Sequence, residues 1–514
     1  MRGWSAREVA EAAGASLVRD RAVGDGPLQA VVDSRLVGPG DLFVGLPGAR
    51  VDGGEFAATA LEAGAWGVLV APDRDVAGTD GAVLAASDPL AALQALARAW
   101  RRALRADVIA VTGSVGKTST KDLIAAMIAP HRRVTASRAN FNTEIGLPLE
   151  LLAAPEDTEV LVLELAMRGA GQIAELTAIC EPDVGVITNI GPVHLEQLGS
   201  LEGVAGAKAE LLVGMRDGGT AVIPAGERLL EPWLRDALRI VRFGPGGDVD
   251  WAGDGTVAAD GERLSLTLPF ESAHNRRNAL AAVAAALAVG VRPGGAIDVR
   301  FGDLRGEKVA LGRGALVIND CYNANPLSMR AALEDLATQE PAARRVAILG
   351  DMLELGPDER EHHRQIGAAA AGAGVDVLVA VGPLAEAMLP AFAGESHAVP
   401  DAAAAARLAE QLVRAGDVVL VKGSRGVGLE VVAEALVAAD EAAGGPDPVG
   451  SAGAAARPGS SGAVPDPSAR PGSSGAAVGA SARPASSGAV PAPSAGGSRP
   501  PVSAAPPSRP PDAG

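Results

Sequence analysis

The stretch VIAVTGSVGKTSTKDLIAAMI, residues 108–128, decides how the middle of this chain folds. A buried-strand pattern, DVIAVTG, passes into a helical pattern, KTSTKDLIAAMIA, through a turn that carries Gly113, Gly116, Lys117 and Thr118. Glycines let the backbone curl so that successive N–H groups converge on an anion at the helix N-terminus. The stretch therefore predicts a phosphate-binding loop between a strand and a helix.

The residues after the second glycine suggest which phosphates the loop holds. In such a loop Lys117 reaches the β- and γ-phosphates of a nucleotide, and the Thr118 hydroxyl binds Mg²⁺. The spacing here is G-x-x-G-K-T, with Val111 where the longer pattern has its first glycine. The alternative is an ordinary glycine-containing turn without a ligand, and the strand and helix on either side favour the nucleotide.

Composition bounds the class of protein. The chain has 514 residues, which predicts about three domains. Apolar residues make up 48% and aromatic residues 3%, so small aliphatic side chains fill the cores. The net charge of −17 argues against a general nucleic-acid-binding protein, which is usually basic. We find neither an apolar run long enough for a membrane helix nor a secretory signal, and the two distant cysteines, Cys180 and Cys321, predict a cytoplasmic protein with reduced thiols.

The C-terminal 71 residues, 444–514, differ in composition from the rest. They are rich in Pro, Ala, Ser and Gly, and three short units follow one another from Arg457, Arg470 and Arg483. Such a segment cannot bury enough apolar area to offset its ordering entropy, so we predict a disordered tail. It is either a tether or a ligand for a partner, and the tether is the simpler interpretation.

The remaining chain divides into three α/β parts. Residues 1–105 hold short apolar runs between helical stretches and predict a small α/β domain. Residues 106–298 alternate strand-like and helical runs around the phosphate loop, which predicts a mostly parallel sheet covered by helices on both faces. Residues 299–443 repeat that alternation and predict a second doubly wound, Rossmann-like domain.

Three polar residues in the central part stand out. Glu164 ends an apolar run, where a buried carboxylate needs a partner such as a metal beside the phosphates; the alternative is an exposed strand end. His194 follows another strand in a Gly/Pro turn, and Lys208 lies among small residues on a predicted helix. Taken alone, the histidine is structural and the lysine is solvated.

Taken together and in order, these stretches resemble the Mur ligase family, the ATP-dependent amide-bond ligases of peptidoglycan synthesis. The resemblance covers most of residues 30–435 and rests on TGSVGKTSTKD, NFNTEIGLPLELL, LELAMRGAGQI, TNIGPVHLEQLGS, AKAEL and HNRRNALAAVAAA. Three further motifs resemble the members that add D-alanyl-D-alanine: NDCYNANPLSMRAAL, ILGDMLELGPDEREHHRQIG and KGSRGVGLE. The stretch from Asp33, DSRLVGPGDLFVGLPGARVDGGEFAATALEAGAWGVLV, points the same way.

The resemblance implies roles for individual residues. Those it assigns to ATP are Gly113, Ser114, Gly116, Lys117, Thr118, Ser119, Asn275, Asn278, Arg305 and Asp320. Those it assigns to the substrates are Ser34 and Arg35 near the uridine nucleotide, Asn140, Asn142, and Asn323 and Asn325 near the dipeptide. It assigns catalysis to Lys117, Glu164, His194 and Lys208, and it assigns Mg²⁺ to Thr118, Glu164, His194 and Lys208, the last as a carbamate.

The activity implied is the ligation of D-alanyl-D-alanine to UDP-N-acetylmuramoyl-tripeptide through an acyl phosphate, with ATP converted to ADP and phosphate. Two Mg²⁺ ions are expected as cofactors, and no nucleic acid or membrane is expected as a partner. The expected setting is a cytoplasmic monomer that supplies cell-wall biogenesis, and with it cell shape, the cell cycle and cell division.

Departures from the family pattern leave some assignments open. Arg313 is an alternative to Arg305 for the ATP-contacting arginine, and DGGEF, residues 52–56, lacks the histidine that the family often carries there. Folylpolyglutamate synthase, a sister ligase that adds a single amino acid, and a non-catalytic nucleotide-sensing scaffold are the rival interpretations. The third residue of the tripeptide, meso-diaminopimelate or L-lysine, stays open.

Overall fold

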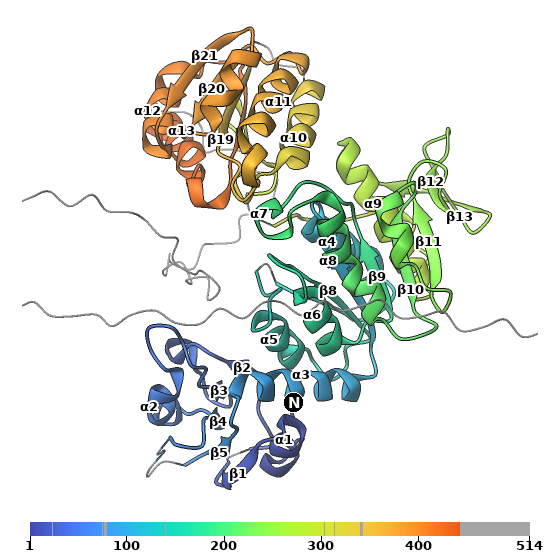
Figure 1. Ribbon diagram of the computed structural model, residues 1–514, viewed down its shortest axis with the longest axis vertical. Coiled ribbons are helices and arrows are strands. Elements are labelled where there is room, and N and C mark those ends of the chain that lie inside the picture. The colour runs from blue at the N-terminus through green and yellow to red at the C-terminus, as the bar shows by residue number, and fades with distance from the viewer. Residues whose placement is uncertain are drawn as a thin grey trace, which may run out of the picture. The chain divides into compact units, whose positions relative to one another are not determined.

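The computed structural model describes residues 1–22, 24–74, 76, 80–138, 140–302, 304–312, 314–339 and 343–442. Within them the chain builds three α/β parts, each around its own sheet (Figure 1). The predicted fold class is confirmed. The predicted disordered tail and the alternative arginine, Arg313, lie outside the described residues. No helix in these ranges is long and apolar enough to cross a membrane.

The N-terminal part is a five-stranded sheet in the order β1-β5-β4-β3-β2. Its strands are β1 Ser16–Arg19, β2 Ala30–Val31, β3 Leu42–Val44, β4 Gly67–Val70 and β5 Ala82–Ala85. Its helices are α1 Ala6–Ala13, η1 Ser34–Leu36, η2 Gly53–Phe56 and α2 Ala57–Glu62. β1 runs antiparallel to β5, and the other neighbours are parallel. The apolar runs of the sequence therefore become the buried middle strands.

The helix α3, Pro89–Leu104, leads from this part into the central one. It begins where the Asp88 carboxylate accepts hydrogen bonds from the N–H groups of Leu90 and Ala91, with Pro89 at the first helical position. Trp100 is buried on its inner face.

The central part is a nine-stranded sheet in the order β14-β13-β12-β11-β10-β9-β6-β8-β7. Its strands are β6 Asp107–Thr112, β7 Val134–Ala136, β8 Val160–Glu164, β9 Val184–Ile187, β10 Thr220–Pro224, β11 Arg239–Phe243, β12 Val249–Trp251, β13 Val257–Ala259 and β14 Glu262–Leu264. In this order, all neighbouring strands from β12 through β6 to β7 pair in parallel, and β13 and β14 add an antiparallel edge. Two short strands, β15 Leu266–Thr267 and β16 Gly295–Ala296, pair separately.

Helices pack around the central strands (Figure 1). They are α4 Lys117–Ile128, α5 Gly146–Ala153, α6 Gln172–Cys180, α7 Leu195–Leu198, α8 Leu201–Gly214, η3 Arg228–Trp233 and α9 Ala273–Ala288. α4 and α9 share one buried core, to which α4 contributes Leu123 and Ile124 and α9 contributes Val283. The many alanines of α9 let it approach α4 closely, because short side chains keep the two backbones near each other. Cys180 and Cys321 are both free and buried.

The C-terminal part is a six-stranded sheet in the order β17-β18-β22-β19-β20-β21, antiparallel only between β17 and β18. Its strands are β17 Glu307–Ala310, β18 Leu316–Asn319, β19 Arg345–Gly350, β20 Val377–Val381, β21 Glu395–Val399 and β22 Val418–Lys422. Its helices are α10 Pro326–Thr338, η4 Gly356–Asp358, α11 Glu359–Gly372, η5 Ala385–Ala391, α12 Ala402–Leu412, η6 Arg425–Val427 and α13 Glu430–Ala442. Candidate residues follow the carboxyl ends of its strands, the edge at which open parallel sheets bind ligands.

Candidate active site

The phosphate loop leads from the end of β6 to the start of α4, as predicted. Gly116 caps α4 with a φ of 81°, in the left-handed region that favours glycine. A Cβ on Gly116 would lie 2.6 Å from Oδ1 of Asn278, so the loop and this asparagine touch. The Asn278 amide in turn donates to Oδ1 of Asn275 at 3.3 Å. Both predicted asparagines, from the first turns of α9, are therefore brought to the loop, and Ser119 follows it in the first turn of α4.

Residues after β9 hold the loop in shape. The Val115 N–H donates to Oδ1 of Asn189 at 2.9 Å, and the amide of Asn189 donates back to the Val115 carbonyl at 2.8 Å. The Thr188 hydroxyl donates to the same carbonyl at 2.6 Å, and the Ser114 hydroxyl accepts from the Gly191 N–H at 2.9 Å. Thr188 and Asn189 stand at the start of the motif TNIGPVHLEQLGS, but no role was predicted for them.

Glu164 is buried at the end of β8, with 5% of its surface exposed. Its carboxylate accepts from the Thr118 hydroxyl at 2.6 Å and from the Asn142 amide at 2.9 Å. The alternative of an exposed strand end is therefore wrong. Two oxygen ligands suited to Mg²⁺, the Thr118 hydroxyl and the Glu164 carboxylate, meet at the start of α4.

Lys117 points back into its own loop. Its ammonium donates to the Gly113 carbonyl at 2.9 Å. Burial lowers the pKa of Lys117 from its ordinary value, the nearby Glu164 carboxylate opposes that shift, and the Arg305 guanidinium adds to it. The charge of Arg305, the first of the two candidate arginines, thus acts on the lysine of the phosphate loop.

Lys208 lies on α8 and is 2% exposed. The alternative of a solvated lysine is therefore wrong. Burial, and then the charge of Lys117, hold the pKa of Lys208 well below its ordinary value. No carboxylate of the described residues is among the groups that shift this pKa. The amine is thus biased toward its neutral, nucleophilic form.

His194 precedes α7 with a φ of 52°. Its Nδ1 lies 2.5 Å from a carboxylate oxygen of Glu354, which itself has a φ of 63°. Asn140 and Leu304 also have left-handed backbones, at 72° and 60°. Such conformations are costly for residues with a Cβ and persist where the surrounding structure enforces them. His194 and Asn140 are themselves predicted site residues, Glu354 pairs with His194, and Leu304 directly precedes Arg305.

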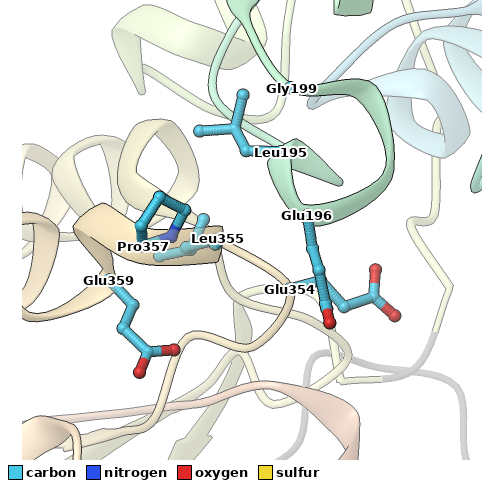
Figure 2. A pocket seen from close by; sticks show the side chains of 8 residues that line it. Leu195, Glu196, Gly199, Glu354, Leu355, Pro357 and Glu359 are labelled. Carbon is cyan, nitrogen blue, oxygen red and sulfur yellow. The ribbon is translucent and has the colours of Figure 1, made fainter.

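A cavity of about 520 Å³ lies beside this ion pair. Figure 2 shows Leu195 and Glu196 entering it from the segment that includes α7, opposite Leu355, Pro357 and Glu359 from the loop after β19. Glu354 lines the same cavity. The quoted motif DMLELGPDER therefore contacts the turn that carries His194, a contact that the sequence analysis did not predict.

Tyr322, the single tyrosine of the chain, joins two predicted residues. The Arg305 guanidinium lies 3.6 Å from the centre of its ring, and its hydroxyl donates to Oδ1 of Asn140. Burial raises the pKa of Tyr322, so its hydroxyl remains a donor. The sequence analysis quoted the motif around this tyrosine but assigned roles only to its asparagines.

The turn after β18 carries the predicted Asp320, Asn323 and Asn325. A carboxylate oxygen of Asp320 lies 2.7 Å from the ammonium of Lys422, which is buried. Asn325 caps α10, because its Oδ1 accepts from the Ser328 N–H at 2.9 Å. The Asn325 side chain thus has a structural partner within its own helix, and Asn323 is exposed.

The predicted uridine-nucleotide residues lie in the N-terminal part. Ser34 and Arg35 begin η1, where the exposed Arg35 pairs with Asp33 at 2.6 Å. At the position of the missing histidine, a Cβ on Gly54 would lie 3.3 Å from the side chain of Arg74. Arg74 in turn pairs with Asp52 of the same motif. The arginine thus occupies the space into which a side chain at position 54 would extend.

The side chains suited to Mg²⁺ are few around the phosphate loop. The described residues contain no group of three or more His, Cys, Asp or Glu side chains that could hold a metal ion. Thr118 and Glu164 supply two hard oxygen ligands, so oxygens from outside the described side chains, such as those of a phosphate, would have to complete a Mg²⁺ site there. The donor chemistry fits Mg²⁺ beside a nucleotide better than a free-standing metal centre.

Family models match all three parts of the chain. Residues 31–102 match the Mur ligase family catalytic domain, residues 111–286 the Mur ligase middle domain, and residues 304–425 the Mur ligase glutamate ligase domain. The UDP-N-acetylmuramoyl-tripeptide–D-alanyl-D-alanine ligase of Bacillus subtilis is 37% identical over 425 residues, which cover 79% of this chain and 92% of that protein.

Solved structures agree with the family models. The crystal structure of MurF from Acinetobacter baumannii aligns with a TM-score of 0.75 at 30% identity, over 84% of this chain and 98% of that one. The complex of MurF from Thermotoga maritima with ADP aligns with a TM-score of 0.70 at 29% identity, over 81% and 98%. The chain therefore belongs to the Mur ligase family.

Proposed function

We propose that this protein is an ATP-dependent ligase that joins D-alanyl-D-alanine to UDP-N-acetylmuramoyl-tripeptide. One observation carries the proposal: at a phosphate loop, the charges of Glu164 and Arg305 act on the pKa of Lys117, and the charge of Lys117 acts on the lowered pKa of the buried Lys208. Together these residues provide a site for the phosphates of a nucleotide, a carboxylate that can bind Mg²⁺, and a second cation, Arg305, for the same phosphates. The similarity to relatives with this printed activity, over most of both chains, supports the choice of substrates.

The nucleotide is proposed to lie between the central and C-terminal parts. The loop N–H groups, Lys117 and Arg305 bind the phosphates, which are strongly anionic. Asn275 and Asn278 contact the base region, and Asp320 binds the ribose. Contact between Asn278 and Gly116 supports this arrangement, since it places the start of α9 against the phosphate loop.

Magnesium is proposed to bind at Thr118 and Glu164, with His194 and the carbamate of Lys208 as further ligands. When bound, Mg²⁺ offsets the charge that accumulates as a carboxylate approaches a phosphate. The neutral amine of Lys208 adds to CO₂ and releases a proton, which converts a buried amine into an anionic oxygen ligand. The lowered pKa of Lys208 supports this, because only the unprotonated amine reacts.

The reaction divides into two displacements. The terminal carboxylate of the tripeptide attacks the γ-phosphorus of ATP, so an O–P bond forms, the bond to ADP breaks, and an acyl phosphate results. Lys117 and Arg305 stabilise the charge on the transferred phosphoryl group. The amine of D-alanyl-D-alanine then attacks the acyl carbon, loses a proton and expels phosphate. An α-amine has a pKa near ~8, so a usable neutral fraction exists without a strong base.

The three parts are proposed to divide the substrates among them. Residues 1–105 bind the UDP-sugar through Ser34 and Arg35, residues 106–298 bind ATP, and residues 299–443 bring the dipeptide through Asn323 and Asn325. Asn140 and Asn142 contact the tripeptide near the phosphate loop. Residues 444–514 are proposed to be a disordered tail. We propose a cytoplasmic location, where these substrates are available, and a monomeric state.

The test is phosphate release by the purified protein with ATP, Mg²⁺ and UDP-N-acetylmuramoyl-tripeptide. We expect turnover with D-alanyl-D-alanine and a product heavier by one dipeptide residue. Tripeptides ending in meso-diaminopimelate and in L-lysine are compared in parallel. Turnover with a single amino acid instead would indicate a sister ligase or a folylpolyglutamate synthase. Tight ATP binding without turnover with any acceptor would indicate a scaffold.

A further inference from the structure

Lys422, the last residue of β22, is a buried cation that the proposed reaction does not use. It belongs to the motif KGSRGVGLE and is 2% exposed. Its ammonium donates to the Asp320 carboxylate at 2.7 Å, to the Asn323 carbonyl at 2.8 Å and to the Asp320 carbonyl at 3.4 Å. All three acceptors lie in one turn, residues 320–323, that follows the neighbouring strand β18.

The contacts of Lys422 fix both ends of that turn. One hydrogen bond sets the direction of the Asp320 carboxylate, and another holds the backbone at Asn323. Neighbouring residues of the same segment add further contacts: the Ser424 hydroxyl donates to the Ala324 carbonyl at 3.4 Å and accepts from the Leu353 N–H at 3.0 Å. The end of β22 thus joins the loops that follow β18 and β19.

Charge explains why this arrangement needs a lysine. A buried ammonium is stable only when paired and hydrogen-bonded, and Asp320 with two carbonyls supplies both. Conversely, without Lys422 the Asp320 carboxylate would turn toward water to recover solvation. The 24% of the Asp320 side chain that is exposed leaves room for that rotation.

We propose that Lys422 is a positioning residue for the nucleotide and the dipeptide. It holds Asp320 in the direction that binds the nucleotide and holds the Asn323 turn in the shape that receives the acceptor amine. The inference rests on the proposed function, which assigns Asp320 and Asn323 to those ligands. Lys422 itself touches neither substrate.

A second ion pair beside the same strand, β22, provides the control. At the opposite end of β22, Arg344 donates to the fully buried Asp417 at 2.8 Å. Removal of Arg344 takes the cationic partner from a fully buried carboxylate, and removal of Lys422 takes it from the partly exposed carboxylate of Asp320. The end of the sheet that holds Arg344 carries none of the candidate residues. Any effect common to Lys422→Met and Arg344→Met is therefore an effect on stability alone.

The decisive measurement is the dissociation constant of AMP-PNP, a non-hydrolysable ATP analogue, by calorimetry on the full-length chain. We expect Lys422→Met to raise it by about 10- to 100-fold, the typical cost of a displaced binding group. We expect Arg344→Met to leave it within about 2-fold. Equal losses in the two variants, or no loss in Lys422→Met, would overturn the inference. The binding measurement needs no turnover. If the wild-type chain binds AMP-PNP but does not ligate, the proposed function is refuted, and the effect of Lys422→Met on AMP-PNP binding can still be measured.

Kinetics extend the test to the dipeptide. We expect Lys422→Met to raise KM for D-alanyl-D-alanine while the dissociation constant of UDP-N-acetylmuramoyl-tripeptide stays unchanged. In an Asp320→Asn background, Lys422→Met should weaken AMP-PNP binding less than in the wild type, because the two residues act as a unit. Fully additive effects would contradict this. If Lys422→Met does not fold, Lys422→Arg keeps the charge but displaces Asp320, and unchanged AMP-PNP binding in that variant would refute the inference.

Discussion

Two lysines of this chain are equally buried and have opposite surroundings. Lys208 in the central part and Lys422 in the C-terminal part are each 2% exposed. Lys422 donates to a carboxylate and to two carbonyls. Lys208 is influenced instead by burial and by a second cation, Lys117, which together hold its pKa well below the ordinary value.

The difference teaches that the partners of a buried lysine, more than its burial, decide its chemistry. Where a carboxylate and carbonyls surround the ammonium, the charge is retained and the residue orders its neighbours. Where a cation is nearby and no carboxylate opposes it, the neutral amine is favoured and becomes a nucleophile. Lys208 is therefore suited to modification by CO₂, whereas Lys422 is suited to holding a turn.

The largest expected effect is that of removing a central lysine. Lys208→Ala and Lys117→Ala should each lower kcat by at least ~10²-fold, because each removes a group that stabilises charge on the transferred phosphoryl group. Steady-state phosphate release checks this. Lys422→Met should act mainly on KM and on nucleotide affinity. Near-normal turnover of Lys208→Ala would show that Lys208 has only a structural role, and Lys208 and Lys422 would then not differ in function.

A charged partner also affects a histidine of the candidate site, since Glu354 pairs with His194. Its carboxylate lies 2.5 Å from His194, and a carboxylate partner orients a metal-binding histidine. Glu354→Gln should raise the Mg²⁺ concentration for half-maximal activity by about 10-fold. A direct titration with Mn²⁺, followed by its paramagnetic resonance, gives a readout independent of turnover.

The control for Glu354 is Glu196→Gln. Glu196 lines the same cavity but is exposed on α7 (Figure 2). If both variants changed the metal dependence equally, the effect would come from the loss of negative charge near the site. The orientation of His194 by Glu354 would then not explain the change in metal dependence.

A smaller effect is expected from removing CO₂. Degassed, bicarbonate-free buffer should lower the rate several-fold, and bicarbonate should restore it, because the carbamate forms reversibly from the neutral amine. With ¹³C-bicarbonate, the protein should show a carbamate carbonyl resonance in NMR spectra. That resonance should vanish in Lys208→Ala and persist in Lys422→Met. A signal that disappeared only in Lys422→Met would reverse the roles assigned to the two lysines.

The sequence predicted the fold well where strands are buried and apolar. The runs DVIAVTG, VLVLEL and DVVLVKGS are strands of parallel sheets, and their order with helices indicated both doubly wound parts. The edge strands β12, β13 and β14 were not predicted. They have three residues each, too few for a periodicity to distinguish them from loops, and β12 and β14 also mix polar with apolar positions.

The site, like the fold, was predicted from the sequence only in part. Single residues with unusual local context, such as Glu164 at the end of an apolar run, were identified from sequence. Partners from distant segments were not: Glu354 is 160 residues from His194, and Lys422 is 102 residues from Asp320. Only folding brings such pairs together, and each half alone resembles an ordinary surface charge.

Asp335 on α10 is a half-buried carboxylate, with 29% of its side chain exposed and Nδ1 of His274 at 3.5 Å, and its desolvation outweighs the opposing charge of Lys308. Burial raises its pKa to about 7, and the nearby Asp320 adds to the shift. The folded chain therefore holds a proton between about pH 4 and pH 7 that the unfolded chain has lost, so the free energy of unfolding falls as pH rises through that range. Asp335→Asn removes this dependence and should raise Tm at pH 8 by about 1–3 °C, with little change at pH 4. Calorimetric melts at both pH values test this against Glu334→Gln, its exposed neighbour on the same helix. A gain that is equal at both pH values would show that Asp335 is not protonated in the folded chain.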